Sequence, residues 1–248
     1  MKEDIFSTSK AFVSVSDADY INMRPITEHI IALERVVYQS FYIVDFFKKN
    51  FYYVSENFAH ICGLTPDEIY KQGFSFYKNR IPEDDCNMMY GIIARASSFC
   101  DSLIREGKDS FTIFCDFHLS DGAHTQLVSH QVTPLAIKEG RPWLALCSVS
   151  MSHNHVSGNL AVKTEKDFMI YKCTNNAREW ECIKIPQLNN IEKNVLRMIA
   201  QGLSTECIAL RLNKSLDTIK SCKKLLFKKI CVRSSSQAIT FVQNYRLI

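Results

Sequence analysis

Lysine and serine side chains recur along residues 214–228 at a spacing suited to binding a polyanion. On a helical wheel at about 100° per residue, Lys220, Ser221, Lys224 and Lys228 fall on one side of the helix that this segment predicts. A helix fits the major groove of duplex DNA, where lysine can donate to guanine and serine can bond to either base edge. The spacing therefore indicates a nucleic-acid-reading helix.

The other side of the same predicted helix is apolar. Ile219, Cys222, Leu226 and Ile230 fall within one narrow sector of the wheel. Such a helix packs one face on neighbouring helices and offers the other to the outside. At its start, Lys214 and Thr218 are placed to reach phosphate groups, as is Lys228 further along. The alternative interpretation is an ordinary charged face in contact with solvent.

The charge of the chain is unevenly distributed. The 248 residues carry a formal net charge of +4. Residues 184–248 hold 12 lysines and arginines against 3 acids, a net of +9, and the remainder holds 18 against 23, a net of −5. A basic tail on an acidic body indicates an anionic partner for the tail alone.

Composition excludes several classes of protein. With 46% hydrophobic and 23% charged residues, the chain is neither collagen-like nor largely disordered. It has no apolar stretch of 18 residues and begins without an apolar leader, so we expect no membrane span and a cytoplasmic location. The ten cysteines form no C-x-x-C pair, and we expect reduced, buried packing residues rather than disulfides or zinc ligands.

Four short helices are predicted after Pro186, which marks a break. The first carries apolar residues from Ile191 to Ala200 and ends near Gly202. Ser204 is expected to cap the second, Ser215 the third, and Ser234 or the next serine the fourth. Four helices with tight connections in about 60 residues are consistent with a helix-turn-helix domain.

Residues 188–239 resemble the LuxR/FixJ-type helix-turn-helix family without a gap. The resemblance implies that the third helix enters the major groove and that the fourth helps to pair two domains. It places Lys220, Ser221 and Lys224 toward the bases and Thr218 at a phosphate. The sequence departs at Cys207, where the family commonly has glutamate. The matching positions are Leu188, Glu192, Val195, Leu196, Ala200, Gly202, Ser204, Ile208, Ala209, Leu212, Ser215, Thr218, Ile219, Lys220, Lys229, Val232, Arg233 and Ala238.

The first 185 residues have a different sequence pattern, with both helical and strand-like segments. Helical spacing covers 25–39, with Pro25 suited to a first turn, and further helices are predicted at 55–62, from Thr65 onward and at 84–105. Runs rich in aromatic and β-branched residues predict strands at 41–47, 51–54, 110–119, 125–137 and 143–151. A smaller β unit is expected at 160–163, 168–173 and 180–185, with turns at Lys166-Asp167 and Asn175-Asn176.

Residues 41–150 resemble a PAS domain. The resemblance rests on Tyr42-Ile43-Val44-Asp45, on the run 51–58, on the run 63–69 and on Ile81-Pro82-Glu83-Asp84-Asp85. It implies a five-stranded antiparallel sheet with helices over one face. It also implies a sensor that holds haem, flavin or a small metabolite, or a module that only dimerises.

The sequence does not identify the ligand of that domain. The helix around Asn57 lacks the Asn-Cys-Arg-like motif that flavin photochemistry needs. His60, His118, His124 and His130 are haem-ligand candidates by residue type alone, and the cofactor is therefore unknown. The early aromatic residues, from Phe41 to Tyr53, could line a pocket but are expected to be core.

The combined prediction is an α+β chain in four parts: a helical region (1–39), a PAS-like sensor (40–152), a β extension (153–185) and a helix-turn-helix domain (186–248). We expect a homodimeric regulator that binds double-stranded DNA and is controlled by a small molecule or by dimerisation. An adaptor whose tail serves only in assembly is the alternative. An enzyme is not expected, because no phosphate loop, metal cluster or nucleophile elbow is visible.

Overall fold

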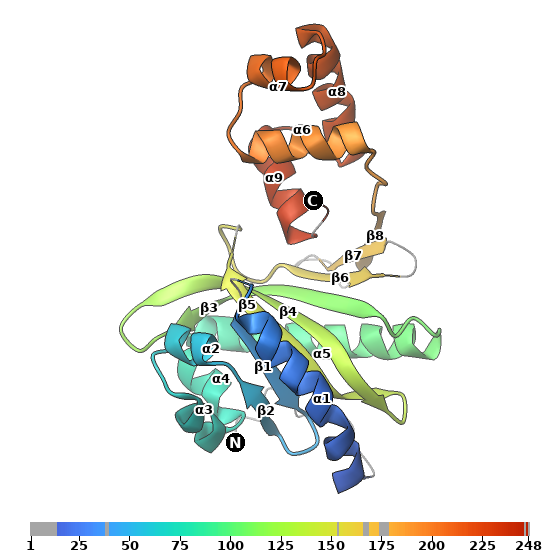
Figure 1. Cartoon of the computed structure of the whole chain (residues 1–248). Helices are drawn as coiled ribbons and strands as arrows, with labels where there is room; N and C mark the ends of the chain where they lie inside the picture. Colours follow the sequence, from blue (N-terminus) through green and yellow to red (C-terminus); the bar gives the residue numbers. More distant parts are fainter. Residues whose placement is uncertain are drawn as a thin grey trace. The chain divides into compact units, whose positions relative to one another are not determined.

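The computed structural model describes residues 14–37, 40–152, 154–165, 169–173, 179–245 and 247. The chain divides into two compact units, Met1–Ile183 and Lys184–Ile248 (Figure 1). No helix among the described residues is long and apolar enough to cross a membrane. Each unit is described by itself below.

The N-terminal unit is built on one antiparallel sheet of eight strands, ordered β2-β1-β5-β4-β3-β6-β7-β8. At the hairpin between the first two strands, the Asp45 carboxylate accepts from the backbone N–H groups of Phe47 and Lys48 at 3.0 and 2.8 Å. These two hydrogen bonds fix the turn that joins the two strands. The strands are β1 (Ser40–Asp45), β2 (Asn50–Val54), β3 (Phe111–Ser120), β4 (Thr125–Lys138), β5 (Arg141–Met151), β6 (Leu160–Thr164), β7 (Met169–Cys173) and β8 (Trp180–Lys184).

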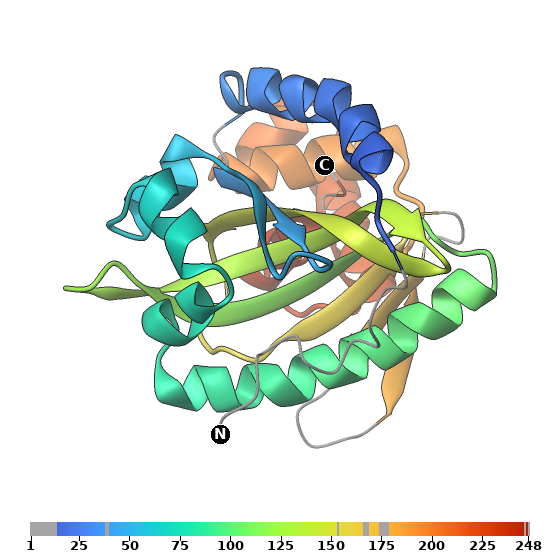
Figure 2. The same cartoon turned by 90° about the horizontal axis from the view of Figure 1, so that it is seen from below.

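Helices cover both faces of this sheet, as Figure 2 shows for α1 and α5. Met23 and Ile30 of α1 pack on Ile43, Trp143 and Leu144 of the sheet. The opposite face carries the remaining helices. The helices of this unit among the described residues are α1 (Asp17–Glu34), α2 (Glu56–Ile61), α3 (Pro66–Gln72), α4 (Ser75–Arg80) and α5 (Glu83–Arg105).

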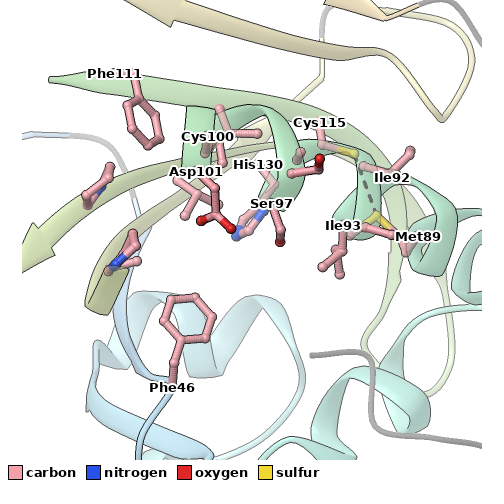
Figure 3. Close-up of a pocket in the computed structure, with 18 of the residues that line it drawn as sticks. Phe46, Met89, Ile92, Ile93, Ser97, Cys100, Asp101, Phe111, Cys115 and His130 are labelled. Carbon is pink, nitrogen blue, oxygen red and sulfur yellow. Dashed lines mark hydrogen bonds between the residues drawn. The ribbon is translucent and has the colours of Figure 1, made fainter. Parts of the chain in front are cut away.

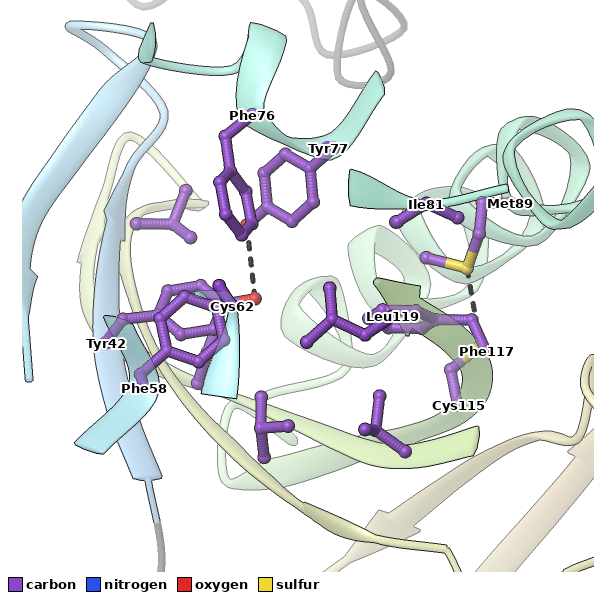
Figure 4. Packing of buried hydrophobic residues seen from close by; sticks show 14 of the residues in the cluster. Tyr42, Phe58, Cys62, Phe76, Tyr77, Ile81, Met89, Cys115, Phe117 and Leu119 are labelled. Atoms are coloured by element: carbon purple, nitrogen blue, oxygen red, sulfur yellow. Dashed lines mark hydrogen bonds between the residues drawn. The ribbon is translucent and has the colours of Figure 1, made fainter. Parts of the chain in front are cut away.

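The main core lies between the sheet and α2 to α5, and aromatic rings dominate it (Figure 4). Tyr42, Phe58 and Phe76 are almost completely buried there. The Tyr42 and Phe58 ring centroids lie 4.4 Å apart, and those of Phe58 and Phe76 lie 5.7 Å apart. Of the early aromatic residues expected to be core, two are buried, Tyr42 and Phe51. Four are half-buried against the core clusters, namely Phe41, Phe46, Tyr52 and Tyr53, and Phe47 is exposed.

Three predictions about this unit need correction. The first helix begins after Ser16, whose capping box with Asp19 starts it, so Pro25 lies inside the helix and not in its first turn. Helix α4 was not predicted from the sequence. The strands at 160–184 do not form a unit of their own, because β6 pairs with β3 and continues the same sheet. The turns predicted at 166–167 and 175–176 lie outside the described residues.

In the part of the C-terminal unit that the structure describes, the chain forms four short helices, as the sequence predicts. They are α6 (Asn190–Ala200), α7 (Thr205–Arg211), α8 (Leu216–Lys229) and α9 (Ser235–Asn244). Ser204, Ser215 and Ser234 each accept a backbone N–H at the start of the helix that follows, which confirms the predicted caps. The α+β fold class, an antiparallel sheet followed by an all-helical domain, is therefore confirmed.

Helices α6, α7 and α8 end in the same way. The residue after each C-cap adopts positive φ: Gly202 at 77°, Asn213 at 50° and Cys231 at 56°. In each case the backbone N–H of the following residue donates a hydrogen bond to a carbonyl oxygen in the last turn of the helix. For example, Val232 N–H donates to Phe227 O at 2.9 Å. This pattern is the Schellman motif, which reverses the chain within two residues.

Cys231 occupies a backbone conformation that glycine adopts with less strain. Its side chain is exposed, so Cys231→Gly loses no packing. We expect this substitution to stabilise the C-terminal unit by about 0.5 kcal/mol, the relief of left-handed strain offset by the backbone freedom of glycine in the unfolded chain. Hydrogen exchange of the α8 and α9 amides measures the effect.

The control is Cys182→Gly, at an exposed cysteine in strand β8. Glycine in an extended strand costs about 0.5–1 kcal/mol, so exchange near β8 is expected to accelerate. Equal effects of the two substitutions would contradict the backbone argument.

The prediction that the cysteines are buried packing residues holds for six of the ten. Cys62, Cys86, Cys100, Cys115, Cys147 and Cys173 are buried, and Cys222 is half-buried. It is wrong for Cys182, Cys207 and Cys231, which are exposed. Cys207 lies in the first turn of α7, where its backbone N–H donates to Ser204 Oγ at 3.2 Å while its side chain faces outward.

Candidate nucleic-acid interface and cavity

Helices α7 and α8 form a helix-turn-helix with a four-residue connection, 212–215. The turn is fixed at both ends. Lys214 N–H donates to Ala209 O at 3.0 Å, closing α7, and Ser215 Oγ accepts Thr218 N–H at 3.1 Å, opening α8. Because both ends are held by hydrogen bonds, the direction of α8 relative to α7 is set by the backbone.

The inner side of α8 anchors it to the rest of the unit. Ile219 and Leu226 are completely buried and Ile230 nearly so. They join one cluster with Val195, Leu196 and Ile199 of α6, with Ile208 and Ala209 of α7, and with Ala238 and Val242 of α9. The apolar sector read from the sequence is thus the packed face, with Cys222 at its half-buried edge.

The residues predicted to meet DNA lie on the outer side of α8, apart from Lys214 in the turn before it. All six, Lys214, Thr218, Lys220, Ser221, Lys224 and Lys228, are exposed. The four lysines among them take part in none of the ion pairs found among the described residues. Thr218 differs, because its hydroxyl lies 2.7 Å from the Ser215 hydroxyl within the cap. The structure therefore leaves the lysines on one accessible surface, and their contact with DNA stays a prediction.

Two further lysines of α8 have structural partners, and sequence reasoning did not separate them from the others. Lys223 is half-buried, and its Nζ donates to Thr205 Oγ1 of α7 at 3.2 Å. Lys229 pairs with Glu192 of α6, its Nζ lying 2.8 and 3.0 Å from the two carboxylate oxygens. The signal for Lys223 was available, since the helical wheel places it on the inner side.

Glu192 has a double role at the start of α6. Its carboxylate accepts the Asn189 backbone N–H at 2.7 Å in a capping box, and it also holds Lys229. Although partial burial opposes it, the hydrogen bonds from Lys229 and Asn189 keep the pKa of Glu192 below its usual value. The pair joins the start of α6 to the end of α8 and so helps to fix the position of α8.

The N-terminal unit holds a cavity of about 370 Å³ between α5 and the sheet (Figure 3). Its wall is mostly apolar, with Met89, Ile92 and Phe111 among the contributing side chains. His130 of β4 and Asp101 of α5 add polar groups. A mostly apolar cavity with a few polar groups is typical of a small-molecule site.

His130 is uncharged at neutral pH, because complete burial lowers the pKa of its imidazole to about 4. Its Nε2 lies 2.6 Å from the Tyr42 hydroxyl, which accepts from the Tyr77 hydroxyl at 3.2 Å. Burial raises the pKa values of both tyrosines well above the usual range. His130 therefore meets the cavity as a neutral member of a hydrogen-bonded chain, while Asp101 and Arg141 add an acidic and a basic side chain to the same wall.

The four histidines considered for haem lie apart. His60 and His124 are exposed, and His118 Nδ1 lies 2.8 Å from the Asp85 carboxylate. His130 is the one that borders the cavity. Within the described part of the chain, no group of three or more histidine, cysteine or acidic side chains is arranged to hold a metal ion.

Comparison with solved structures returns VqmA proteins at low similarity. A Vibrio cholerae VqmA dimer without target DNA is 16% identical over 88% of this chain and 87% of that chain, with a TM-score of 0.32. A phage VqmA–DPO complex is 15% identical over 90% of each chain, with a TM-score of 0.31. At these values the likeness establishes neither a common fold nor a common function.

Comparison with curated proteins finds no match. A family model does match the C-terminal unit. The model described as bacterial regulatory proteins, luxR family, covers residues 186–242, which include the turn and the whole of α8. The last quarter of this chain is therefore a helix-turn-helix domain of the LuxR family.

Proposed function

We propose that this chain is a transcription regulator that binds specific sequences of double-stranded DNA as a homodimer and responds to a small molecule. The observation that carries the proposal is the exposed lysine face of α8 within a LuxR-family domain. A helix of this kind has one packed side and one side that fits the major groove. The net charge of +9 on residues 184–248 supplies the attraction to phosphate.

Each exposed side chain has a proposed role. Lys220, Ser221 and Lys224 lie along the middle of α8, where they would face base edges. Lys214 and Thr218 flank the helix start, where they would contact one phosphate strand. Lys228, two turns further than Ser221, would contact the backbone beyond the groove.

The N-terminal unit is proposed to be the PAS-type sensor, occupying about residues 40–152. Support comes from its strand order β2-β1-β5-β4-β3, from the packing of α2 to α5 over one face of the sheet and from the cavity between α5 and the sheet. The flanking parts would be a helical region before residue 40, a β extension at 153–185 and the helix-turn-helix domain at 186–248. A regulator of bacterial genes works in the cytoplasm, which is its proposed location.

Selection from a random-sequence duplex library tests the DNA-binding part. We expect the full-length protein to enrich one motif, with twofold symmetry if the chain binds as a dimer. Failure to enrich any motif, with a stoichiometric protein recovered instead from a cell extract, would favour the adaptor alternative.

The cavity can be tested with an uncharged, apolar fluorescent dye such as N-phenyl-1-naphthylamine. Ser97 lines the cavity on α5, so Ser97→Phe is expected to fill part of it and weaken dye binding at least tenfold. Asn87→Phe, at an exposed position of the same helix, is the matched control and should bind as the unaltered protein does. Equal dye binding by both variants would show that the dye, and the proposed ligand, lie elsewhere.

A further inference from the structure

One ring nitrogen of His130 has no partner within the protein. The side chain is 7% exposed and borders the cavity together with Ser97 and Asp101 (Figure 3). Its Nε2 lies beside the Tyr42 hydroxyl, but no partner of its Nδ1 is found among the described residues. A buried polar atom is costly to leave unpaired, so we looked for the group that would satisfy it.

The Nδ1 atom is not sealed inside the core. Among the described residues, two buried side-chain atoms lack both a hydrogen-bond partner and contact with open space, namely Glu34 Oε1 and Arg95 Nε. His130 Nδ1 is not one of them, although the residue is buried, so this atom faces open space. The open space that His130 borders is the cavity.

The other polar side chains of the cavity wall are less buried or already paired. Asp101 is exposed, and Ser97 and Arg141 are half-buried. Tyr77 is buried, but its hydroxyl donates to Tyr42 at 3.2 Å. The most buried nitrogen or oxygen atom that the wall leaves for a ligand is therefore Nδ1 of the histidine.

The hydrogen-bonded chain behind His130 decides which ring nitrogen carries the proton. A neutral imidazole has one N–H donor and one bare acceptor nitrogen. The Tyr42 oxygen accepts from Tyr77, and its own single proton has two acceptors within reach, His130 Nε2 at 2.6 Å and the Cys147 thiol. Sulfur is a weak acceptor, so Tyr42 donates to Nε2. The proton of the imidazole is then on Nδ1, which faces the cavity as a donor.

We infer that His130 Nδ1–H recognises the ligand of the cavity, and that this ligand is a compact apolar molecule with an uncharged acceptor, such as a carbonyl oxygen or a ring nitrogen. A carboxylate at this position would be buried beside a neutral ring, which is costly. Met89, Ile92 and Phe111 would hold the apolar body in the cavity of about 370 Å³. Tyr42 is a positioning residue, because it acts on the ligand through His130.

This inference rests on the small-molecule response of the proposed function and names the chemistry of the ligand. It does not require that the protein bind DNA.

Three bicyclic probes of similar size test the inference. Naphthalene forms no hydrogen bond, quinoline carries an acceptor nitrogen, and indole carries a donor N–H. Each probe is titrated into full-length protein loaded with N-phenyl-1-naphthylamine, and displacement of the dye gives its affinity. We expect quinoline to bind about fivefold more tightly than either other probe, because it alone pairs with Nδ1–H. Equal affinities would overturn the inference and mean that a water molecule satisfies this nitrogen.

The position of the proton can be measured without a ligand. In ¹⁵N–¹H NMR spectra of histidine-labelled full-length protein, we expect His130 to show a protonated Nδ1 and a bare Nε2. Tyr42→Phe removes the donor to Nε2 and should let the proton exchange between the two nitrogens. Tyr53→Phe is the matched control, because its hydroxyl donates to Glu34 of α1 and not to this chain, and the His130 signals should not change. A proton on Nε2 in the unaltered protein would contradict the inference.

Two substitutions separate the roles of the two ring nitrogens. The side-chain amide of asparagine can place its NH₂ group near the position of Nδ1, whereas the longer glutamine places its amide near Nε2. We expect His130→Asn to keep the preference for quinoline over naphthalene and His130→Gln to lose it. The preference is a ratio within one variant, so a loss of stability affects both probes alike. The same preference in both variants would also overturn the assignment of Nδ1.

Failure of the inference and failure of the proposed function give different results. If Ser97→Phe weakens dye binding but the three probes bind equally, the cavity remains a small-molecule site and the inference fails. If the unaltered protein does not bind the dye, or Ser97→Phe binds it equally well, the proposed sensor site fails and the inference fails with it.

Discussion

Replacing Lys220 and Lys224 by alanine is expected to reduce affinity for the selected duplex at least 100-fold. Each lysine lies on the exposed middle of α8, and neither takes part in an ion pair among the described residues. A good base contact contributes about 1–3 kcal/mol, so losing two contacts costs roughly 2–6 kcal/mol. Fluorescence anisotropy with a labelled duplex measures the change.

The fold should survive this double substitution, because both side chains point away from the core cluster of the C-terminal unit. The control removes the same charge from another helix: Lys193→Ala with Arg197→Ala on α6. That variant loses only long-range electrostatic attraction to the DNA. We therefore expect its affinity for the selected duplex to change less than tenfold. Similar losses in the two variants would mean that total charge, and not the α8 face, determines binding.

The second large effect is expected from Ile219→Ala. This side chain is completely buried where α8 meets the other helices. Truncating a buried isoleucine to alanine costs about 2–5 kcal/mol. A unit of 65 residues has only about 3–10 kcal/mol in total, so much of its stability would be lost. Hydrogen exchange should show faster exchange in α6 to α9, and DNA binding should fall with it.

Leu225→Ala is the matched control on the same helix. Its side chain is 67% exposed, so the same kind of truncation removes little packing and should change stability by less than about 0.5 kcal/mol. If the amides of α6 to α9 exchanged hydrogen at the same rate in both variants, the core described for this unit would be wrong. Because exchange is followed amide by amide, the N-terminal unit serves as an internal reference.

Much of the C-terminal unit could be predicted because its signals are local. Serine caps at 204, 215 and 234 mark where three of the helices begin, and the positive-φ residue Gly202 marks where α6 ends. Each of these signals lies within a few residues of the helix end that it determines. The wheel then divides α8 into Ile219 and Leu226 on one side and the lysines on the other. The wheel also places Lys223 on the inner side, but its partner, Thr205, lies on another helix and cannot be identified from the sequence of α8 alone.

Several features of the N-terminal unit could not be predicted from the sequence of single segments. Helix α4 is six residues long and has no side-chain cap, and its Phe76 and Tyr77 are aromatic residues that suit a strand equally well. The pairing of β6 with β3 joins residues more than 40 positions apart, and nothing in either strand specifies the other. The cavity has the same origin, because its wall gathers side chains from α5 and from several strands.

The most direct test of the central claim is the salt dependence of binding to the selected duplex and to a shuffled duplex of equal composition. We expect both affinities to fall steeply with salt, because each neutralised phosphate releases counterions. The selected duplex should bind at least 1,000-fold more tightly at about 0.15 M salt, a typical specificity ratio for a sequence reader. Equal affinities for the two duplexes across the titration would contradict the account, because the lysine face of α8 would then provide charge without reading sequence.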